Sequence, residues 1–311
     1  MKAVRYYEYG DPNVMRYEDA DQPHPALGQV LVQVAATSFN PVDASIRAGY
    51  LQQDLPLRFP HTPGIDVAGM VAALGEGVTG FNIGDRVIGF LPMNENGAAA
   101  EFVLAPAAVL TAAPRRVPLA DAAALPAVAL TAWQALFEQA KLQAGQRILV
   151  NGAGGGVGGF AVQFAKGAGA TVIATASPRS ADAIRSDGAD QIVDYTTTSL
   201  TDAIEEPVDV VLNLVRGSEE DMATLVGLVA PGGVLVTTAS PAQDDPARKV
   251  RAINMFVRSD VDQLAAIVAK VDAGDLRIDI SATYPLSDIA LVHERGAAGK
   301  FRGKVVLVPK S

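Results

Sequence analysis

The sequence contains no cysteine among its 311 residues. This absence excludes disulfide bonds, thiolate metal sites and cysteine nucleophiles together. The sequence also lacks any uninterrupted apolar run of about 18 residues, and no apolar stretch follows the basic residues of the opening "MKAVRYYEYGDPN". We therefore predict neither a membrane-spanning helix nor a cleavable signal, and a cytoplasmic location is the default expectation.

Positive charge is scarce in this chain. Lysine and arginine number 25 against 34 aspartate and glutamate residues, which gives a formal net charge of −9. Because nucleic-acid binding draws on clustered Lys and Arg, this balance argues against nucleic acid as a partner. With 49% hydrophobic and 19% charged residues, the composition predicts a globular protein, and the length allows two domains with substantial cores.

The periodicity of apolar residues divides the chain. Residues 1–120 hold short β-rich runs such as "QVLVQVAAT" and "DRVIGF" between Gly and Pro turns, which predicts a mostly antiparallel unit. From residue 121 helical stretches alternate with apolar runs, which predicts a parallel sheet with right-handed crossovers. The last strand, in "GKVVLVP", is expected to return to the first domain. We predict an α/β protein with a mostly-β domain (1–120 and 275–311) and a parallel-sheet domain (121–274).

The helices and strands of the second domain are predicted from these patterns. The strands are expected in "RILVNG", "ATVIATAS", "QIVDY", "VDVVLNLV" and "GVLVTTAS". The helices are expected at Val157–Gly167, near Ala181–Ser186, at Ser218–Val229 and in the amphipathic segment "DVDQLAAIVAKVDAG".

Six of the eight residues from Gly152 to Gly159 are glycine. This segment stands between a strand and a helix, so the unpaired N–H groups of the first helical turn point toward whatever binds there, most often a pyrophosphate. Gly155 and Gly156, with Val157 beside them, would let phosphates approach the backbone, and Gly158 would allow close helix packing. The alternative is a glycine-rich turn that serves packing alone.

The end of the second strand of this domain indicates the type of dinucleotide. A cofactor with free ribose hydroxyls is normally met there by an acidic residue, and "ATASPRS" has none. Ser177 and Arg179 instead offer a hydroxyl and a guanidinium for a 2′-phosphate, and Tyr195 adds a donor if the next strand ends beside them. We therefore predict NADPH rather than NADH. Arg179 can alternatively be a solvated residue at a helix start.

Several strings together resemble a known family. They are "AAALPAVALTAWQAL", "GQRILVNGAGGGVGGFAVQFAKGAGATVIATASPRS", "GEGVTGFNIGDRVIG" and the final "GKVVLVP". The sequence resembles the zinc-independent quinone oxidoreductase branch of the medium-chain dehydrogenase/reductase superfamily. The resemblance implies a GroES-like substrate domain, a Rossmann-type doubly wound nucleotide domain and an active site in the cleft between them. It also implies homodimers joined through the strand "GVLVTTAS", whose edge would otherwise be unpaired.

The zinc-dependent branch of the superfamily needs cysteine and histidine ligands. The corresponding positions here read Asn40 and Ile65, and the three histidines lie far apart in sequence. We therefore expect no metal. Without zinc to polarise a carbonyl, hydride transfer from the cofactor suits an electrophilic small molecule, either a quinone or an α,β-unsaturated carbonyl.

Three polar residues are candidates for the reaction. The resemblance implies that Asn40 lies near the acceptor oxygen, with Asp43 nearby and Thr131 beside the nicotinamide. Each has a structural alternative. Asn40 can be a turn residue before a proline, Asp43 a carboxylate at a helix start, and Thr131 a buried helix hydroxyl.

The sequence departs from the family pattern in two places. Ser45 stands where members often carry a tyrosine, and Tyr50 either takes the place of that tyrosine or does not. Asn213 and "VRGS" stand where an aspartate and two glycines are typical. The role of Arg216 is unexplained, so an acidic substrate and a rearranged cofactor loop both remain open. Two other functions also stay open: reduction of enoyl thioesters, and non-enzymatic NADPH binding by a sensor or structural protein.

Overall fold

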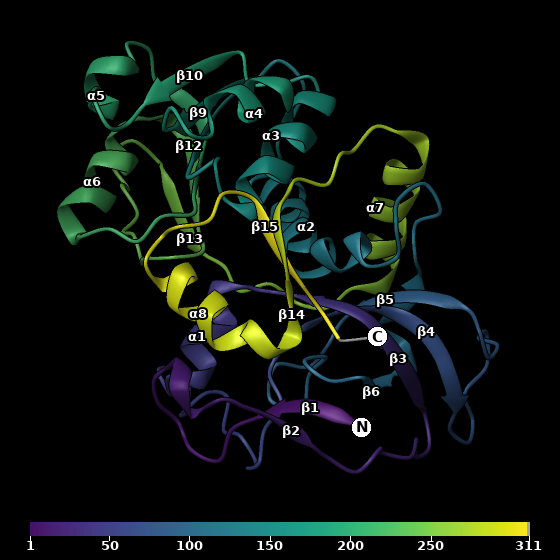
Figure 1. Ribbon diagram of the computed structural model, residues 1–311. Helices are drawn as coiled ribbons and strands as arrows, with labels where there is room; N and C mark the ends of the chain where they lie inside the picture. Colours follow the sequence, from purple (N-terminus) through teal and green to yellow (C-terminus); the bar gives the residue numbers. More distant parts are fainter. Residues whose placement is uncertain (310–311) are drawn as a thin grey trace. The chain divides into compact units, whose positions relative to one another are not determined.

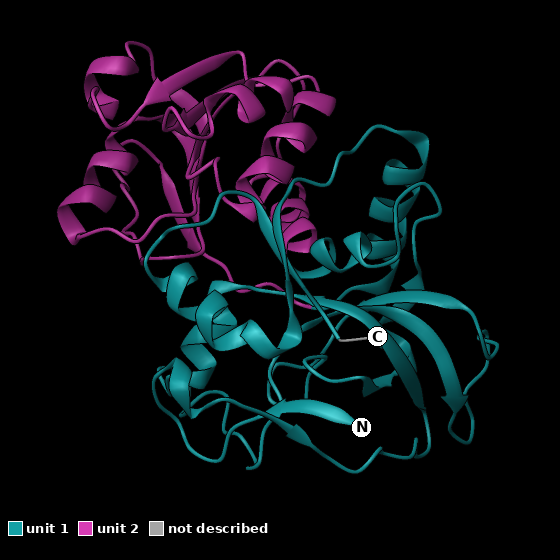
Figure 2. Ribbon diagram, in the orientation of Figure 1, with its two compact units in different colours: residues 1–127, 259–311 teal, residues 128–258 magenta. Residues whose placement is uncertain are grey.

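The computed structural model describes residues 1–309 and forms two compact units (Figure 2). Unit 1 comprises residues 1–127 and 259–311, and unit 2 comprises residues 128–258. The sequence-based domain assignment stays a prediction, and it differs from these units chiefly at helix α7 (Val261–Ala273), which packs on strand β7 (Leu110–Ala112) of unit 1.

One side chain explains why α7 belongs with unit 1. Asp272 lies in the last turn of α7, and its Oδ1 accepts hydrogen bonds from the backbone N–H groups of Arg115 and Arg116 at 2.7 and 3.1 Å. Gly274, in the left-handed conformation, ends the helix. The helix is therefore tied to the loop that follows β7.

Unit 1 is built on a seven-stranded sheet in the order β14-β15-β3-β4-β5-β7, with β6 also paired to β3. All of these pairs are antiparallel except β14 with β15, which confirms the predicted antiparallel character. The bounds are β3 (Gln29–Ser38), β4 (Asp66–Leu74), β5 (Arg86–Phe90), β6 (Phe102–Pro106), β14 (Ile280–Pro285) and β15 (Lys304–Val308). β15 pairs with β3, so the prediction that the last strand returns to the first domain is also confirmed.

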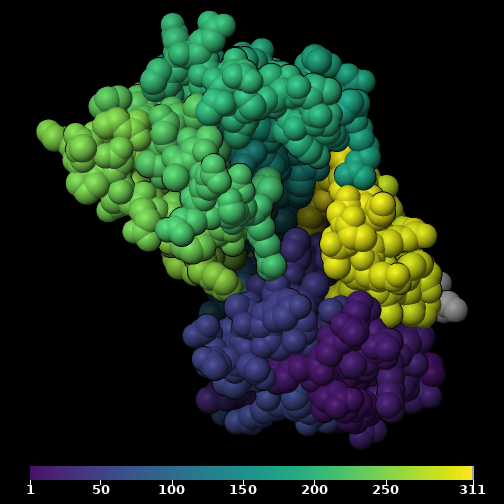
Figure 3. Space-filling model, turned by 90° about the vertical axis from the view of Figure 1, so that its left-hand side faces the viewer, coloured from purple at the N-terminus to yellow at the C-terminus, as the bar shows by residue number. Residues whose placement is uncertain are grey.

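Both ends of unit 1 share one hydrophobic cluster. Its members come from β1 (Lys2–Arg5), from helix α8 (Ile289–Ala297) and from β15. Figure 3 shows the N-terminal segment, in purple, beside the C-terminal segment, in yellow. The short helix α1 (Pro41–Arg47) packs against α8, and β2 (Arg16–Asp19) pairs with β1.

Unit 2 is a six-stranded, wholly parallel sheet in the order β10-β9-β8-β11-β12-β13 (Figure 1). Its strands are β8 (Arg147–Asn151), β9 (Thr171–Ala176), β10 (Gln191–Asp194), β11 (Val208–Asn213), β12 (Val229–Thr237) and β13 (Arg251–Asn254). Its helices are α2 (Pro126–Trp133, which begins in unit 1), α3 (Gly156–Gly167), α4 (Ala181–Ser186), α5 (Leu200–Ala203) and α6 (Glu219–Gly227). The predicted doubly wound parallel sheet is confirmed.

Two expectations for unit 2 were wrong. The helix expected to end at Val229 ends at Gly227, because Val229 already begins β12. The strand "GVLVTTAS" is not the edge of the sheet either, since Val234–Thr237 of β12 pair with β13. The segment "RAIN" of β13 has polar residues at both ends and is too short to produce an apolar run, so its strand pairing was missed.

The helices of the described residues are all too short or too polar to cross a membrane.

Candidate functional site

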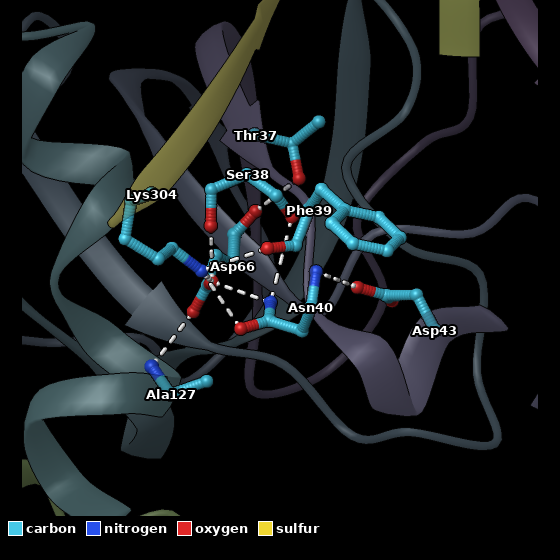
Figure 4. Close-up of polar contacts among 8 residues, drawn as sticks. All are labelled: Thr37, Ser38, Phe39, Asn40, Asp43, Asp66, Ala127 and Lys304. Atoms are coloured by element: carbon cyan, nitrogen blue, oxygen red, sulfur yellow. Dashed lines mark hydrogen bonds and ion pairs between the residues drawn. The ribbon is translucent and has the colours of Figure 1, made fainter. Parts of the chain in front are cut away.

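Asp66 is the centre of a buried polar network in unit 1 (Figure 4). It begins β4 and is fully buried. Its Oδ2 accepts hydrogen bonds from Ser38 Oγ at 2.5 Å and from Asn40 Nδ2 at 2.8 Å. Its Oδ1 accepts the backbone N–H of Ala127, at the start of α2, at 2.7 Å. A buried carboxylate is thus held by three donors from two other segments.

Lys304 supplies the opposite charge. Its side chain is 3% exposed, and its Nζ lies 3.4 Å from Asp66 Oδ2. The same Nζ donates to Asn40 Oδ1 at 2.7 Å and to the Phe39 carbonyl at 3.0 Å. Burial lowers the pKa of Lys304, and the nearby carboxylates oppose that shift. The ammonium group therefore fixes which end of the Asn40 amide faces Asp66.

Asn40 and Asp43 also form the N-terminal cap of α1. The Asn40 N–H donates to Asp43 Oδ2 at 3.1 Å in a capping box, and Pro41 occupies the first helical position. Both side chains are buried. Burial chiefly, and then the charge of Asp66, raise the pKa of Asp43 to about 7. The structure thus brings two of the sequence-predicted catalytic residues together, and their roles in catalysis stay predictions.

Ser45 and Tyr50, the two residues compared with the family tyrosine, lie within and just after α1. Ser45 donates its hydroxyl to the Pro41 carbonyl at 3.2 Å within α1. Tyr50 follows the helix, and its side chain is 77% exposed.

The glycine-rich turn of unit 2 joins β8 to α3. Gly152 has φ +93°, and Gly155 is the N-cap of the helix. A Cβ at Gly158 would lie 2.5 Å from the Ala153 Cα, so only glycine lets the helix approach the turn this closely. A Cβ at Gly155 would meet nothing nearer than 3.6 Å. The space above Gly155 is open, and a side chain would fill it, so the backbone there fits a phosphate group.

A row of four polar side chains braces this turn. They lie at or next to the last residue of four neighbouring strands, namely Asn151, Thr175, Asn213 and Thr237. Thr175 Oγ1 accepts the Gly152 N–H at 2.8 Å and donates to Asn151 Oδ1 at 3.0 Å. Asn213 bridges to Asn151 and to Thr237 at 2.9 and 3.2 Å. The sequence analysis missed this row, although an uncharged polar residue near the end of each apolar strand was a visible signal.

The residues predicted to distinguish the dinucleotide lie at the same end of the sheet. Ser177 directly follows β9, and Arg179 is exposed two residues later. Asp194 of β10 lies opposite Ala176, so Tyr195, 58% exposed, follows at the end of the neighbouring strand. The Asp194 carboxylate is engaged by the Thr196 N–H and hydroxyl at 3.0 and 2.6 Å. Contacts of Ser177, Arg179 and Tyr195 with a cofactor stay predictions.

Two further positions belong to unit 2. Thr131 lies on α2 and is 8% exposed, and its contact with the nicotinamide stays a prediction. Arg216 is exposed in the loop after β11. A Cβ on Gly152 would lie 2.8 Å from Val215, so the loop that carries Arg216 packs on the glycine-rich turn.

Known families match both parts of the chain. The family model described as "Alcohol dehydrogenase GroES-like domain" matches residues 26–115, and the one described as "Zinc-binding dehydrogenase" matches residues 188–307. A curated quinone oxidoreductase from Sus scrofa is 32% identical, with 96% of each chain covered. The solved quinone oxidoreductase from Coxiella burnetii is 31% identical, with a TM-score of 0.91 and coverage of 100% of this chain and 99% of that one.

A mycobacterial structure complexed with NADPH is similar as well, at 28% identity and a TM-score of 0.87, with 99% of this chain and 100% of that chain covered. The combination of a GroES-like unit with a second unit that has a parallel sheet and a glycine-rich turn is typical of the medium-chain dehydrogenase/reductase superfamily. Within that superfamily, the chain belongs to the zinc-independent quinone oxidoreductase branch.

No group of three or more His, Cys, Asp or Glu side chains is arranged to hold a metal ion within residues 1–309. Ile65, at one of the positions compared with zinc ligands, is buried and apolar. Asn40, at the other, is bonded to Asp66 and Lys304. The donor set therefore does not fit a catalytic zinc.

Two functional candidates, Asp66 and Lys304, were missed from the sequence. Asp66 stands in "HTPGIDVAG" and Lys304 in "GKVVLVP", each beside apolar strand residues. A single charge at the start of a buried strand is rarely tolerated without a partner. That signal could have predicted that the two residues pair, although 238 positions separate them.

Two buried histidines of unit 1 are neutral at pH 7. Burial lowers the pKa of His61 to about 4. Burial first, and then the charge of Arg47, lower the pKa of His293 to about 3. The Arg47 Nη1 lies 3.1 Å from His293 Nδ1. An unfolded histidine takes up its proton at higher pH than either residue does in the fold, so acid favours the unfolded state through both.

We expect the free energy of unfolding to fall between pH 6.5 and pH 4. Each histidine contributes a loss of about 1.4 kcal/mol per pH unit there, because only its unfolded form titrates in that window. Asp43 acts oppositely, since its raised pKa gives a contribution that is present at low pH and lost as the pH rises through about 7. The net loss from the three groups is about 3 kcal/mol.

Urea unfolding at the two pH values measures this loss. In an Asp43→Asn variant the opposing contribution is absent, so the loss between the same pH values should be about twice as large. The same loss in both proteins would contradict the assignment of Asp43 as a carboxyl with a raised pKa.

Proposed function

We propose that this protein is an NADPH-dependent oxidoreductase that transfers a hydride to a quinone or an α,β-unsaturated carbonyl without a resident metal. The single observation that carries the proposal is the open glycine-rich turn between β8 and α3, in a chain that is related over nearly its full length to quinone oxidoreductases. The Coxiella burnetii and mycobacterial structures support the quinone and the NADPH, respectively.

Unit 2 holds the cofactor in this proposal. The backbone of Gly155, Gly156, Val157 and Gly158 binds the pyrophosphate at the N-terminus of α3. Ser177, Arg179 and Tyr195 bind the 2′-phosphate of the adenosine ribose, and Thr131 contacts the nicotinamide. When bound, the cofactor supplies a hydride from its nicotinamide ring. The row of polar side chains from Asn151 to Thr237 keeps the turn in place.

Asn40 is the proposed donor to the acceptor oxygen. One of its amide hydrogens bonds Asp66 at 2.8 Å, whereas the other reaches the Ser38 carbonyl only at 3.5 Å, the limit of a hydrogen bond. The second N–H is therefore the one available to a ligand oxygen. Lys304 and Asp66 hold the amide in one orientation, so little reorganisation is needed when negative charge develops on that oxygen.

A panel of acceptors tests the function. Purified protein with NADPH should oxidise the cofactor steadily in the presence of quinones and simple enones, as followed by the loss of absorbance of the reduced nicotinamide. Faster turnover of enoyl-CoA thioesters would instead make the protein an enoyl-thioester reductase. Binding of NADPH without oxidation in any arm would indicate a non-enzymatic role.

Arg179→Ala is expected to weaken NADPH binding far more than NADH binding. A charge-assisted hydrogen bond to a phosphate contributes roughly 1.5–3 kcal/mol, which is about a 10- to 150-fold change in affinity. Titration calorimetry of both cofactors with both proteins measures the change in preference. Equal losses for NADPH and NADH would remove Arg179 from the 2′-phosphate site.

Arg216→Ala is the matched control for that titration. Arg216 is also an exposed arginine at the carboxyl end of the sheet, but it follows β11 rather than β9. NADH and NADPH differ only at the adenosine ribose, so this variant should leave their affinity ratio unchanged. A lost NADPH preference in Arg216→Ala would move the 2′-phosphate to the β11 side.

The protein is further proposed to form a homodimer through β13. This strand is the edge of the unit 2 sheet, and within the described residues no strand pairs with its outer side. Such an edge is a template for pairing with a second copy. Light scattering during gel filtration should give twice the chain mass of 32.3 kDa, and a mass of one chain would contradict the dimer.

A further inference from the structure

The hydroxyl group of Tyr6 is buried without a hydrogen-bond partner among the described residues. The side chain is fully buried, and its ring packs edge-on against Phe59 and His61, with centroid distances of 5.8 and 5.3 Å. Backbone bonds between Tyr6 and His61, at 3.0 and 2.9 Å, hold the residue in place. An unpaired buried hydroxyl is costly, so something outside the chain is expected to satisfy it.

Tyr6 lines a small cavity. Its volume is about 10 Å³, and its polar lining residues are Tyr6, Asp43, His61, Thr62 and Glu95. One water molecule needs a space of about this size and two to four polar partners. An organic ligand is far too large for it. The cavity therefore suits a single water molecule.

Asp43 is the residue of this cavity that titrates near neutral pH. Burial raises the pKa of Tyr6, which keeps it a hydroxyl, and burial lowers the pKa of His61 to about 4, which keeps it neutral. The Asp43 carboxyl, with its pKa of about 7, exists in both forms near neutrality. Its Oδ2 accepts a hydrogen bond from the Asn40 N–H.

Other charged or titratable groups lie near Asp43. They are Tyr6 just after β1, Arg47 of α1, Asp66 of β4, Lys304 of β15, and His61 and Glu95 of the cavity lining. Asp66 raises the pKa of Asp43 and Lys304 lowers it. These two form a pair with each other, so their effects on Asp43 partly cancel.

We propose that one water molecule in this cavity links the Tyr6 hydroxyl to Asp43, and that this hydroxyl–water–carboxyl chain holds the proton that completes the reduction. Tyr6 acts as a positioning residue, because it orients the water and does not itself react. The inference rests on the proposed function for its chemical step, and on the orphaned hydroxyl and the cavity for the water.

The chemical step balances as follows for an enone. With the cofactor bound, transfer of one hydride (two electrons and a hydrogen) to the β-carbon would leave an enolate and an oxidised cofactor. The O–H bond of Asp43 breaks and its proton forms a new O–H bond on the enolate oxygen. The resulting enol then tautomerises in water by giving up the O–H proton and gaining a proton on the α-carbon, and so forms the saturated ketone. The Asp43 carboxylate then regains a proton from bulk water through the cavity water. No further oxidant or reductant is needed.

Two measurements on Tyr6→Phe test the proposal. The first is the titration of the Asp43 carboxyl by NMR in protein with ¹³C-labelled aspartate, without substrate, assigned by its loss in Asp43→Asn. Removing the Tyr6 hydroxyl frees the water, so the Asp43 carboxylate loses a hydrogen-bond donor. The pKa of Asp43 should therefore rise by about one pH unit. The second is the pH dependence of kcat/KM with an enone, whose fall above neutral pH should move by the same amount.

Tyr9→Phe is the matched control. Its hydroxyl also lies in unit 1, but it accepts the Leu57 N–H at 3.2 Å and does not line the cavity. This variant should leave the Asp43 titration and the pH profile unchanged.

The outcomes test the water link and the proton supply separately. An unchanged Asp43 titration in Tyr6→Phe overturns the link, as does a wild-type protein in which no carboxyl titrates near pH 7. If the Asp43 titration shifts but the pH profile of kcat/KM does not shift with it, Asp43 does not supply the proton. If no acceptor is reduced while the NMR titration still shifts, the hydroxyl–water–carboxyl link stands and the proposed function fails.

Discussion

Lys304→Met is expected to lower the free energy of unfolding by about 3–5 kcal/mol, the usual effect of removing one partner of a buried ion pair. Methionine matches the length of the lysine stem, so the loss comes from the charge and its bonds. Asp66 would remain fully buried without its cation, and the Asn40 amide oxygen would lose its donor. Urea unfolding at pH 7 measures the change.

Two variants make this result interpretable. Lys2→Met removes an exposed ion pair with Asp19, whose side chains are 44% and 83% exposed, and should leave the free energy of unfolding nearly unchanged, because solvent screens the two charges. The double variant Lys304→Met/Asp66→Asn should cost clearly less than the sum of its single changes, because no lone buried charge remains. Strict additivity would show that the two charges do not interact.

Asn40→Ala is expected to slow the turnover of a weakly electrophilic enone by about 10- to 1,000-fold, the effect of removing one donor to a developing oxyanion. The loss for an electrophilic quinone should be smaller, since its reduction depends less on stabilising negative charge. The ratio of the two kcat/KM losses is the measured quantity.

Ser38→Ala controls for damage to the buried network. Its hydroxyl also donates to Asp66 Oδ2, but it is not a proposed donor to the substrate. Ser38→Ala should lower stability and leave the enone-to-quinone ratio near its wild-type value. If Asn40→Ala lowers kcat/KM equally for both acceptors, the Asn40 amide positions the network and does not stabilise the oxyanion.

Local patterns were sufficient to predict much of the fold. The strand, glycine-rich turn and helix around Gly155 depend on residues that are adjacent in sequence, and so does the capping pair Asn40 and Asp43. Helix α4 was predicted with the bounds that it has, Ala181–Ser186. These elements follow from propensity, capping and backbone freedom, which are properties of short segments.

Features that depend on distant partners could not be predicted in the same way. The Asp66–Lys304 pair joins strands at opposite ends of the chain, and the polar row across β9, β8, β11 and β12 exists only once the sheet order is set. Strand β13 is defined by its pairing with β12 rather than by its composition. The orphaned Tyr6 hydroxyl is likewise visible only when its packed neighbours are known.

Hydride transfer to a conjugated acceptor is the central claim, and deuterium labelling tests it most directly. Protein freed of metal by exhaustive chelation would reduce a simple enone with NADPH deuterated at the transferred position of C4, and mass spectrometry of the product would locate the label. The account predicts one deuterium on the β-carbon of the saturated ketone, at a rate unchanged by chelation. A product without deuterium, or activity that returns only when zinc is added, would contradict it.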